Sequence, residues 1–278
     1  MGPEAPVAGR VLELAEDLNT HVPLSPGAER IVDVAFVIWL GTSSSEPSFT
    51  VVQRLRLEPS TVEPTVGRVR DLLDRRGRRS RTWEVGPSAT PADLAGRLEA
   101  LGMAPYREPL VVGMVLTEAP PEVAGVGARR AVTLADHIAA ERILAEGFES
   151  EAPEEEIARQ AELALQADRT GTRAVYLASV GGEPVAAAIA VFTDRGVVMS
   201  GGATQPAARG RGAYRALVAA RWHDAAARGV PVLVTQAGSM SRPILRRLGF
   251  REVCEIWILL DESAGTSTAE GAQGPRDR

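Results

Sequence analysis

The segment of this sequence best suited to chemistry is a short loop rich in glycine and arginine, Arg209–Gly212. It follows an apolar stretch, 197–204, that reads as a strand, and it leads directly into a predicted helix, 212–228. The first N–H groups of a helix have no partner within it, and the helix dipole adds positive potential there. The two glycines let the backbone approach an anion closely, and the two arginines add charge. The pattern therefore predicts a phosphate-binding site.

Two other phosphate loops fit this segment less well. A P-loop requires a lysine directly after its last glycine, whereas Gly212 is followed by Ala213 and Tyr214. A dinucleotide fingerprint requires a third glycine three residues after Gly212, and that position holds Arg215. Neither class of nucleotide-binding protein is favoured.

The loop and its surroundings resemble motif A of the GNAT superfamily of N-acyltransferases, [QR]-x-x-G-x-[GA], which binds the pyrophosphate of acyl-CoA. Arg209 and Gly212 match the first two defined positions, whereas Tyr214 stands where the family has glycine or alanine. A helix end of the form Leu-Gly-Phe, 248–250, follows at the expected distance. The resemblance covers roughly residues 131–260.

The resemblance implies an enzyme that transfers an acyl group, by default acetyl from acetyl-CoA, to an amine that attacks the thioester directly. It also implies that the amides of the strand before the loop bind the pantetheine arm and polarise the thioester carbonyl. The residues implied in binding acetyl-CoA are Gly202, Ala203, Thr204, Arg209, Gly210, Arg211, Gly212, Ala213 and Tyr214.

The residues that would move protons are less clearly marked. Many family members protonate the leaving thiolate with a tyrosine four residues before the Leu-Gly-Phe glycine, and that position is Leu245 here. Ser241 is the preferred substitute, although a helix N-cap explains this serine equally well and solvent could supply the proton. Glu141 and His137, on the first helix of the second half, are the candidate bases, with a solvated helix position as the alternative for His137.

The elements around the loop follow from hydrophobic periodicity and from helix start and stop signals. Thr133 or Asp136 caps a helix that runs to Phe148, and Pro153 with three glutamates opens another that ends near Asp168. The remaining expected elements are strands over 173–180, 185–192, 197–204, 230–236 and 252–260 and a helix over 239–248. Strands 197–204 and 230–236 should separate to admit acyl-CoA.

The first half repeats part of this order without the glycine-rich loop. A helix over 66–75, a strand over 81–85, a helix over 91–101 and a strand over 109–116 are expected. RLEALGM (97–103) then corresponds to ILRRLGF (244–250). We therefore predict a mixed α/β fold with two GNAT-like domains, each a mostly antiparallel mixed sheet flanked by helices. The predicted division is a degenerate domain at 1–120, a linker at 118–128, a catalytic domain at 129–261 and a disordered tail at 262–278.

Bulk composition excludes several classes of function. The 278 residues carry a net charge of −5, which argues against phosphate neutralisation as a nucleic-acid binder would need it. Cys254 is the single cysteine, so no intrachain disulfide forms, and the three histidines lack metal-ligand spacing, so no metal is expected. No secretory signal or membrane span is visible, and a cytoplasmic protein is expected.

The expected partner is a small-molecule amine acceptor, with no nucleic acid and no membrane, and a homodimer is one open alternative for the assembly. Three other functions stay open at this point. The first is a catalytically silent acyl-CoA sensor, and the second is a transferase of the same fold with a different acyl donor or acceptor. The third is a purely structural interaction protein, which would not bind CoA.

Overall fold

The computed structural model describes residues 7–42 and 46–263. The α-helices are α1 (Gly9–Glu16), α2 (Leu18–His21), α3 (Val62–Asp74), α4 (Leu94–Ala100), α5 (Leu134–Gly147), α6 (Glu154–Asp168), α7 (Ala213–Ala227) and α8 (Arg242–Arg247). The strands are β1 (Glu29–Val32), β2 (Val37–Leu40), β3 (Thr50–Gln53), β4 (Ser80–Val85), β5 (Ala104–Leu116), β6 (Gly127–Arg130), β7 (Arg173–Val180), β8 (Glu183–Phe192), β9 (Val197–Thr204), β10 (Leu233–Ala237) and β11 (Arg251–Glu262). Short 3-10 helices lie at Pro47–Phe49, Pro59–Thr61 and Pro206–Ala208.

The strands form one 11-stranded sheet in the order β1-β2-β3-β4-β11-β5-β10-β9-β8-β7-β6. All neighbours are antiparallel except β3 with β4 and β9 with β10, so the mixed, mostly antiparallel sheet is confirmed. In the second half, α7 and α8 pack on one face of the sheet, and α5 and α6 pack on the other. Buried apolar side chains hold these layers together.

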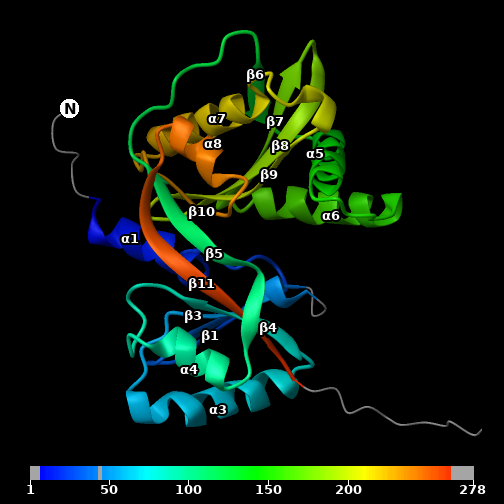
Figure 1. Ribbon diagram of the computed structural model, residues 1–278. Coiled ribbons are helices and arrows are strands. Elements are labelled where there is room, and N and C mark those ends of the chain that lie inside the picture. Colours follow the sequence, from blue (N-terminus) through cyan, green and yellow to red (C-terminus); the bar gives the residue numbers. More distant parts are fainter. Residues whose placement is uncertain (1–6, 43–45, 264–278) are drawn as a thin grey trace, which may run out of the picture.

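The two halves of the chain exchange strands where they meet. β4 of the first half pairs with β11, so that Val85 lies opposite Trp257, while β5 of the first half pairs with β10, so that Met114 lies opposite Thr235. β5 and β11 also pair with each other and run side by side through the narrow middle of the molecule (Figure 1). The halves therefore share one continuous sheet, which the sequence alone does not indicate.

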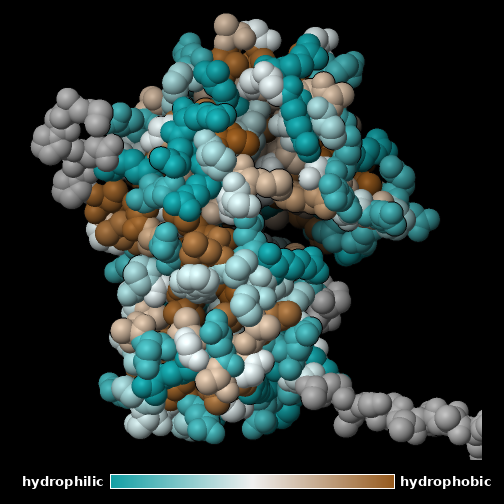
Figure 2. All heavy atoms as spheres, in the orientation of Figure 1, coloured by the Kyte–Doolittle hydropathy of each residue, from teal (hydrophilic) through white to brown (hydrophobic). Residues whose placement is uncertain are grey.

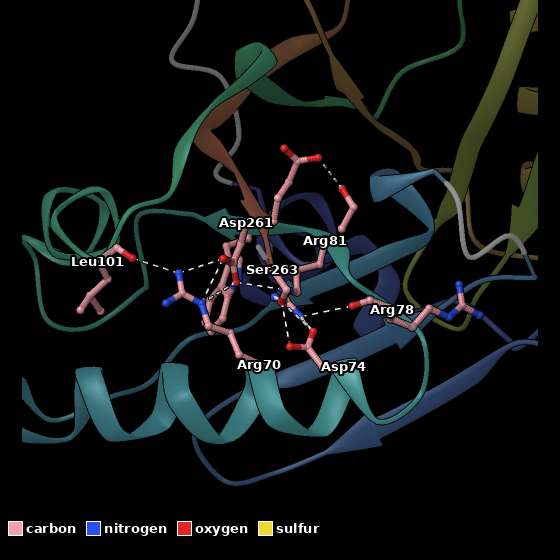
Figure 3. A network of polar contacts seen from close by, with 10 residues as sticks. Arg70, Asp74, Arg78, Arg81, Leu101, Asp261 and Ser263 are labelled. Carbon is pink, nitrogen blue, oxygen red and sulfur yellow. Dashed lines mark hydrogen bonds and ion pairs between the residues drawn. The ribbon is translucent and has the colours of Figure 1, made fainter. Parts of the chain in front are cut away.

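Ion pairs anchor the end of β11 in the first half (Figure 3). The carboxylate of Asp261 accepts hydrogen bonds from Arg70 Nη2 at 2.8 Å, Arg81 Nε at 2.9 Å and Trp83 Nε1 at 3.2 Å. Arg81 also donates to Asp74 at 2.8 Å. Because Arg81 and Asp261 are completely buried, each charge depends on these partners.

The predicted repeat is visible in the structure. In each half a strand, a helix, a strand parallel to the first, a short helix and a long strand follow one another. The glycines that end α4 and α8, Gly102 and Gly249, both have φ of +92°, the left-handed conformation expected at this position. The apolar residues after them, Met103 and Phe250, are buried against their own half of the core.

Several local predictions are confirmed and several boundaries change. α3 begins at Val62, β5 at Ala104 and β10 at Leu233, where residues 66, 109 and 230 were predicted. Thr133 and Asp136 form a capping box at the start of α5, and α6 begins and ends as expected. Within the predicted linker, however, β6 begins at Gly127, because this short strand pairs with β7. The predicted tail also begins too early, since β11 runs to Glu262 and the hydroxyl of Ser263 donates to Asp74. The rest of that tail, 264–278, lies outside the described residues.

Candidate functional site

The predicted anion loop lies between β9 and α7. Gly210 and Gly212 have φ of +76° and +88°, a region that glycine adopts without strain. Gly212 is the N-cap of α7, and no side chain caps the first turn, so its N–H groups can bind an anion. Arg209 and Arg211 are exposed beside it. This arrangement fits a pyrophosphate group.

Packing around Gly212 also leaves no room for a larger residue. A Cβ atom at this position would lie 2.8 Å from Cγ1 of Val123, a residue of the segment between the two halves. Val123 and Val126 pack against the core beneath α7. The connecting segment therefore covers one side of the loop, while a Cβ on Gly210 would meet nothing within 4 Å.

The sheet opens beside this loop. β9 pairs with β10 only through Val197 and Val198, although both strands continue further. The predicted separation of these strands is therefore confirmed. At the fork, the Thr235 hydroxyl donates to the Met199 carbonyl at 3.3 Å. Beyond it the edge of β9 is not paired to β10, and a thioester arm could extend along this edge.

Gly201 forms a β-bulge at this edge of β9. The pairing with β8 passes from Ser200 to Gly202, and Gly201, with φ of +68°, has no opposite residue. A bulge reorients the backbone amides locally. The bulge lies in the segment that the resemblance implies polarises the thioester carbonyl.

Tyr214, where the motif normally has a small residue, packs against the bulged strand. A Cβ atom on Gly202 would lie 3.3 Å from the Tyr214 ring, so a larger residue at 202 would press on this ring. The guanidinium of Arg221 lies 6.0 Å from the Tyr214 ring, and its Nη1 donates to the Ile189 carbonyl opposite the bulge at 3.4 Å. Arg221 is 1% exposed, its Nη2 has no partner in the described chain, and burial lowers its pKa.

The other predicted loop residues differ in what they offer. The Ala203 side chain is buried against α5, and Ala213 is buried in the core beside α7, so only their backbone groups could contact a ligand. The hydroxyl of Thr204 is buried without a partner. A buried hydroxyl in this state is a site where a ligand or a water could bind.

Ser241 is the residue before α8, and its hydroxyl donates to the Gly238 carbonyl at 3.5 Å. It is half-buried, and its role as the acid stays a prediction. Leu245, at the usual tyrosine position, is 1% exposed and belongs to the core beneath α7 and α8. The structure offers no tyrosine in its place on α8.

His137 lies between α5 and α6, where its ring is completely buried. Nδ1 lies 2.9 Å from the Thr133 carbonyl and Nε2 lies 3.1 Å from Oδ2 of Asp168. Burial lowers the pKa of His137, but the hydrogen bonds to Asp168 and Thr133 outweigh it and raise the pKa. Since both ring nitrogens are engaged, we assign His137 a structural role in place of the predicted base.

Glu141 lies one turn after His137 and is half-buried. Burial raises the pKa of its carboxyl group, while the nearby Arg173 opposes this shift. A carboxylate with a raised pKa accepts a proton more readily than an ordinary one, so Glu141 remains a candidate base. It does not line the cavity described next.

A cavity of about 530 Å³ lies against the fork, on the face of the sheet opposite α7. Met199, Ser200, Thr235 and Gln236 bring the edges of β9 and β10 into its wall. The first half supplies another wall with Leu18, Asn19, Val22, Leu24 and Trp39. Figure 2 shows the surface hollowed where the two halves face each other. Trp39 and α2 carry no sequence signal for a cavity, because their apolar residues resemble ordinary core positions.

The described residues contain no candidate metal cluster and no candidate membrane span. No group of three or more histidine, cysteine, aspartate or glutamate side chains is placed to hold a metal ion there. In the same residues, no helix is long and apolar enough to cross a membrane.

The family profile of the acetyltransferase (GNAT) domain matches residues 123–239. This range includes the loop, the bulged strand and both sides of the fork. No curated protein matches the sequence.

Solved structures with this fold extend over both halves. A GCN5-related N-acetyltransferase from Kribbella flavida matches with a TM-score of 0.67 and 18% identity, over 91% of this chain and 96% of that one. A tandem GNAT protein from the clavulanic acid biosynthesis pathway matches with a TM-score of 0.59 and 16% identity, over 100% of this chain and 92% of that one. A GCN5-related N-acetyltransferase from Sphaerobacter thermophilus matches with a TM-score of 0.57 and 17% identity, over 83% of this chain and 82% of that one.

These identities show a common fold, and the family profile adds the type of chemistry. Residues 123–239 match the acetyltransferase (GNAT) domain family, which supports an acyltransferase, and the chain as a whole has the fold of GNAT N-acetyltransferases.

Proposed function

We propose that this protein is an N-acetyltransferase that moves an acetyl group from acetyl-CoA to the amine of a small molecule. The observation that carries the proposal is the fork between β9 and β10. It lies beside the anion loop, and the cavity of about 530 Å³ opens against it. A donor held at the loop and an acceptor held in the cavity would meet at this fork.

The donor would be held through its phosphates and its pantetheine arm. Arg209, Arg211 and the first-turn amides of α7 would bind the pyrophosphate. The unpaired edge of β9 would hydrogen-bond the pantetheine, and the amides at the Gly201 bulge would stabilise the oxyanion that develops on the thioester carbonyl. The side chains of Tyr214 and Arg221 support this strand from behind.

The reaction is a single displacement. The neutral amine nitrogen attacks the thioester carbon, an N–C bond forms, the C–S bond breaks, and the CoA sulfur leaves as a thiolate. The proton that the attacking nitrogen loses goes to a base such as Glu141 or to water. The thiolate takes up a proton from Ser241 or from solvent, so the protons balance.

Because Leu245 stands where many family members have the acidic tyrosine, a sensor that binds acyl-CoA without turnover is one alternative. Because a CoA thiolate is a stable leaving group, the loss of a dedicated acid slows the reaction without preventing it. A transferase of this fold with another acyl donor is the second alternative, and it predicts tighter binding of a bulkier acyl-CoA.

Calorimetric titration with acetyl-CoA and with free CoA tests the donor site. We expect micromolar binding that weakens at least tenfold in the double variant Arg209→Gln/Arg211→Gln, with an unchanged Tm. Arg75→Gln, which removes an exposed charge in the first half, is the matched control and should bind like the wild type. No binding at millimolar ligand would refute the donor site.

An assay of thiol release with an amine present then distinguishes an acetyltransferase from an acyl-CoA sensor. An enzyme releases CoA in proportion to the amide formed. A protein that binds acetyl-CoA but releases no thiol with a broad set of amines is a sensor.

A further inference from the structure

The cavity at the fork is unusual in its charges. Among the lining residues that the structure describes there is no aspartate, glutamate, histidine or lysine, and the charged side chain in its wall is Arg173. Its floor and walls include Val22, Leu24, Val191 and Val198 together with the Trp39 ring. A pocket for a polyamine or another polycation needs carboxylates, and this one supplies a cation and apolar surface.

Arg173 has capacity left for a ligand. Its Nη1 donates to Oδ1 of Asp168 at 2.5 Å and to the Ala164 carbonyl at 3.3 Å, which leaves Nε and Nη2 without a partner in the described chain. Asp168 is fully engaged, because its Oδ2 also accepts from the amide of Val175 at 2.9 Å and contacts His137. The carboxylate thus orients Arg173 from behind and does not line the cavity.

The strand register gives the distance between Arg173 and the fork, where the thioester would react. Arg173 lies opposite Val191, Val191 lies opposite Val198, and Val198 lies opposite Val234 beside the fork. Adjacent strands are about 4.8 Å apart, so Arg173 is roughly 10 Å along the sheet from Val198. Val191 and Val198 form an apolar floor between the cation and the fork, where Ser200 and Thr235 lie.

Resting on the proposed function, we infer that the acceptor is a small amino acid in the broad sense, with an amine at one end, an apolar middle and a carboxylate at the other. The amine lies at the fork near Ser200 and Thr235. The apolar middle lies over Val191 and Val198 against Trp39. The carboxylate pairs with Nε and Nη2 of Arg173.

Three amines with the same six-carbon chain test this order of groups: 6-aminohexanoate, hexylamine and 1,6-diaminohexane. In thiol-release assays with acetyl-CoA we expect kcat/KM to be at least tenfold higher for 6-aminohexanoate than for hexylamine, and lowest for the diamine. In Arg173→Met the ratio of kcat/KM for 6-aminohexanoate to kcat/KM for hexylamine should fall to about one. In Arg173→Lys part of this preference should remain. A ratio measured within one variant does not depend on how much of that variant is folded.

Binding without turnover separates this inference from the proposed function. In the presence of free CoA, 6-aminohexanoate should raise Tm and the diamine should not. If 6-aminohexanoate binds but no thiol is released, the acetyl-transfer proposal fails and the pocket assignment stands. If the diamine binds or reacts as well as 6-aminohexanoate, or if 6-aminohexanoate does not bind, the inference is overturned.

Discussion

Arg81 of β4 donates from Nε to Oδ2 of Asp261 in β11 across 2.9 Å, and the exposed fractions of the two side chains are 0% and 1%. This ion pair joins a strand of the first half to a strand of the second half. It lies far from the fork, so its role is in stability.

Asp261→Asn should lower the free energy of unfolding by roughly 3 to 5 kcal/mol, because the buried Arg81 then keeps only Asp74 as an anionic partner and Arg70 loses its carboxylate. Denaturant unfolding followed by tryptophan fluorescence measures this loss. Asp194→Asn is the matched control, since the Arg10–Asp194 pair also joins distant parts of the chain but its side chains are 61% and 78% exposed. It should cost less than about 1 kcal/mol. Equal losses in the two variants would contradict the anchoring role.

Gly212→Ala should destabilise the protein more than Gly210→Ala. Both positions have positive φ, which costs an alanine about 1 kcal/mol, but only the Cβ at 212 meets Val123. Thermal unfolding of the two single variants gives the comparison, and adding Val123→Ala to Gly212→Ala should restore part of the loss. The same contact means that Gly212→Glu, which would place a carboxylate against a bound pyrophosphate, also perturbs the fold. An equal Tm for the two alanine variants would show that the Val123 contact is unimportant.

Arg221→Met should keep or raise Tm and lower kcat about tenfold. Methionine fills the space without the cost of a buried guanidinium that has no carboxylate partner among the described residues, but it loses the hydrogen bond to the Ile189 carbonyl opposite the bulge. A role in packing alone would instead lower Tm and leave kcat unchanged. Differential scanning calorimetry and thiol-release kinetics on the same sample distinguish the two outcomes.

Glu84 should make the protein less stable as pH rises. Burial and, to a lesser extent, the neighbouring Asp17 raise the pKa of this carboxyl group from 4.5 to about 8. A raised folded-state pKa means that the folded protein holds a proton that the unfolded chain releases, so the contribution of Glu84 to stability is fully present below pH 4.5 and is lost as the pH rises to about 8.

Comparison with Glu84→Gln isolates this effect from other titrating groups. The difference in unfolding free energy between variant and wild type should grow with pH across that window, by up to about 1.4 kcal/mol per pH unit. Urea unfolding at several pH values measures it. A difference that does not change with pH would show that Glu84 is ionised in the folded protein.

Local elements of the second half were predictable because their signals are local. The glycine before α7, the capping box at Thr133 and the three glutamates that open α6 each act within a few residues. The anion loop was found for the same reason. Its function depends on one turn of backbone and on charges that are adjacent in the sequence.

Pairings between distant segments were not predictable in this way. β5 and β11 are both long apolar strands after a Leu-Gly helix end, and their patterns do not say which sheet each one joins. The buried position of His137 depends on Asp168 of a different helix. The cavity requires Trp39 and Arg173, which come together only when the two halves share a sheet.

The exchanged strands also determine when the first half can finish folding during synthesis. β4 needs β11 as its neighbour, and β11 follows every other strand in the chain that the structure describes. Until β11 leaves the ribosome, one edge of β4 and one edge of β5 remain unpaired, and such edges promote aggregation. The first half is translated first but completes its sheet last, together with the second half, so the sheet that joins the two halves can close only after β11 has been synthesised.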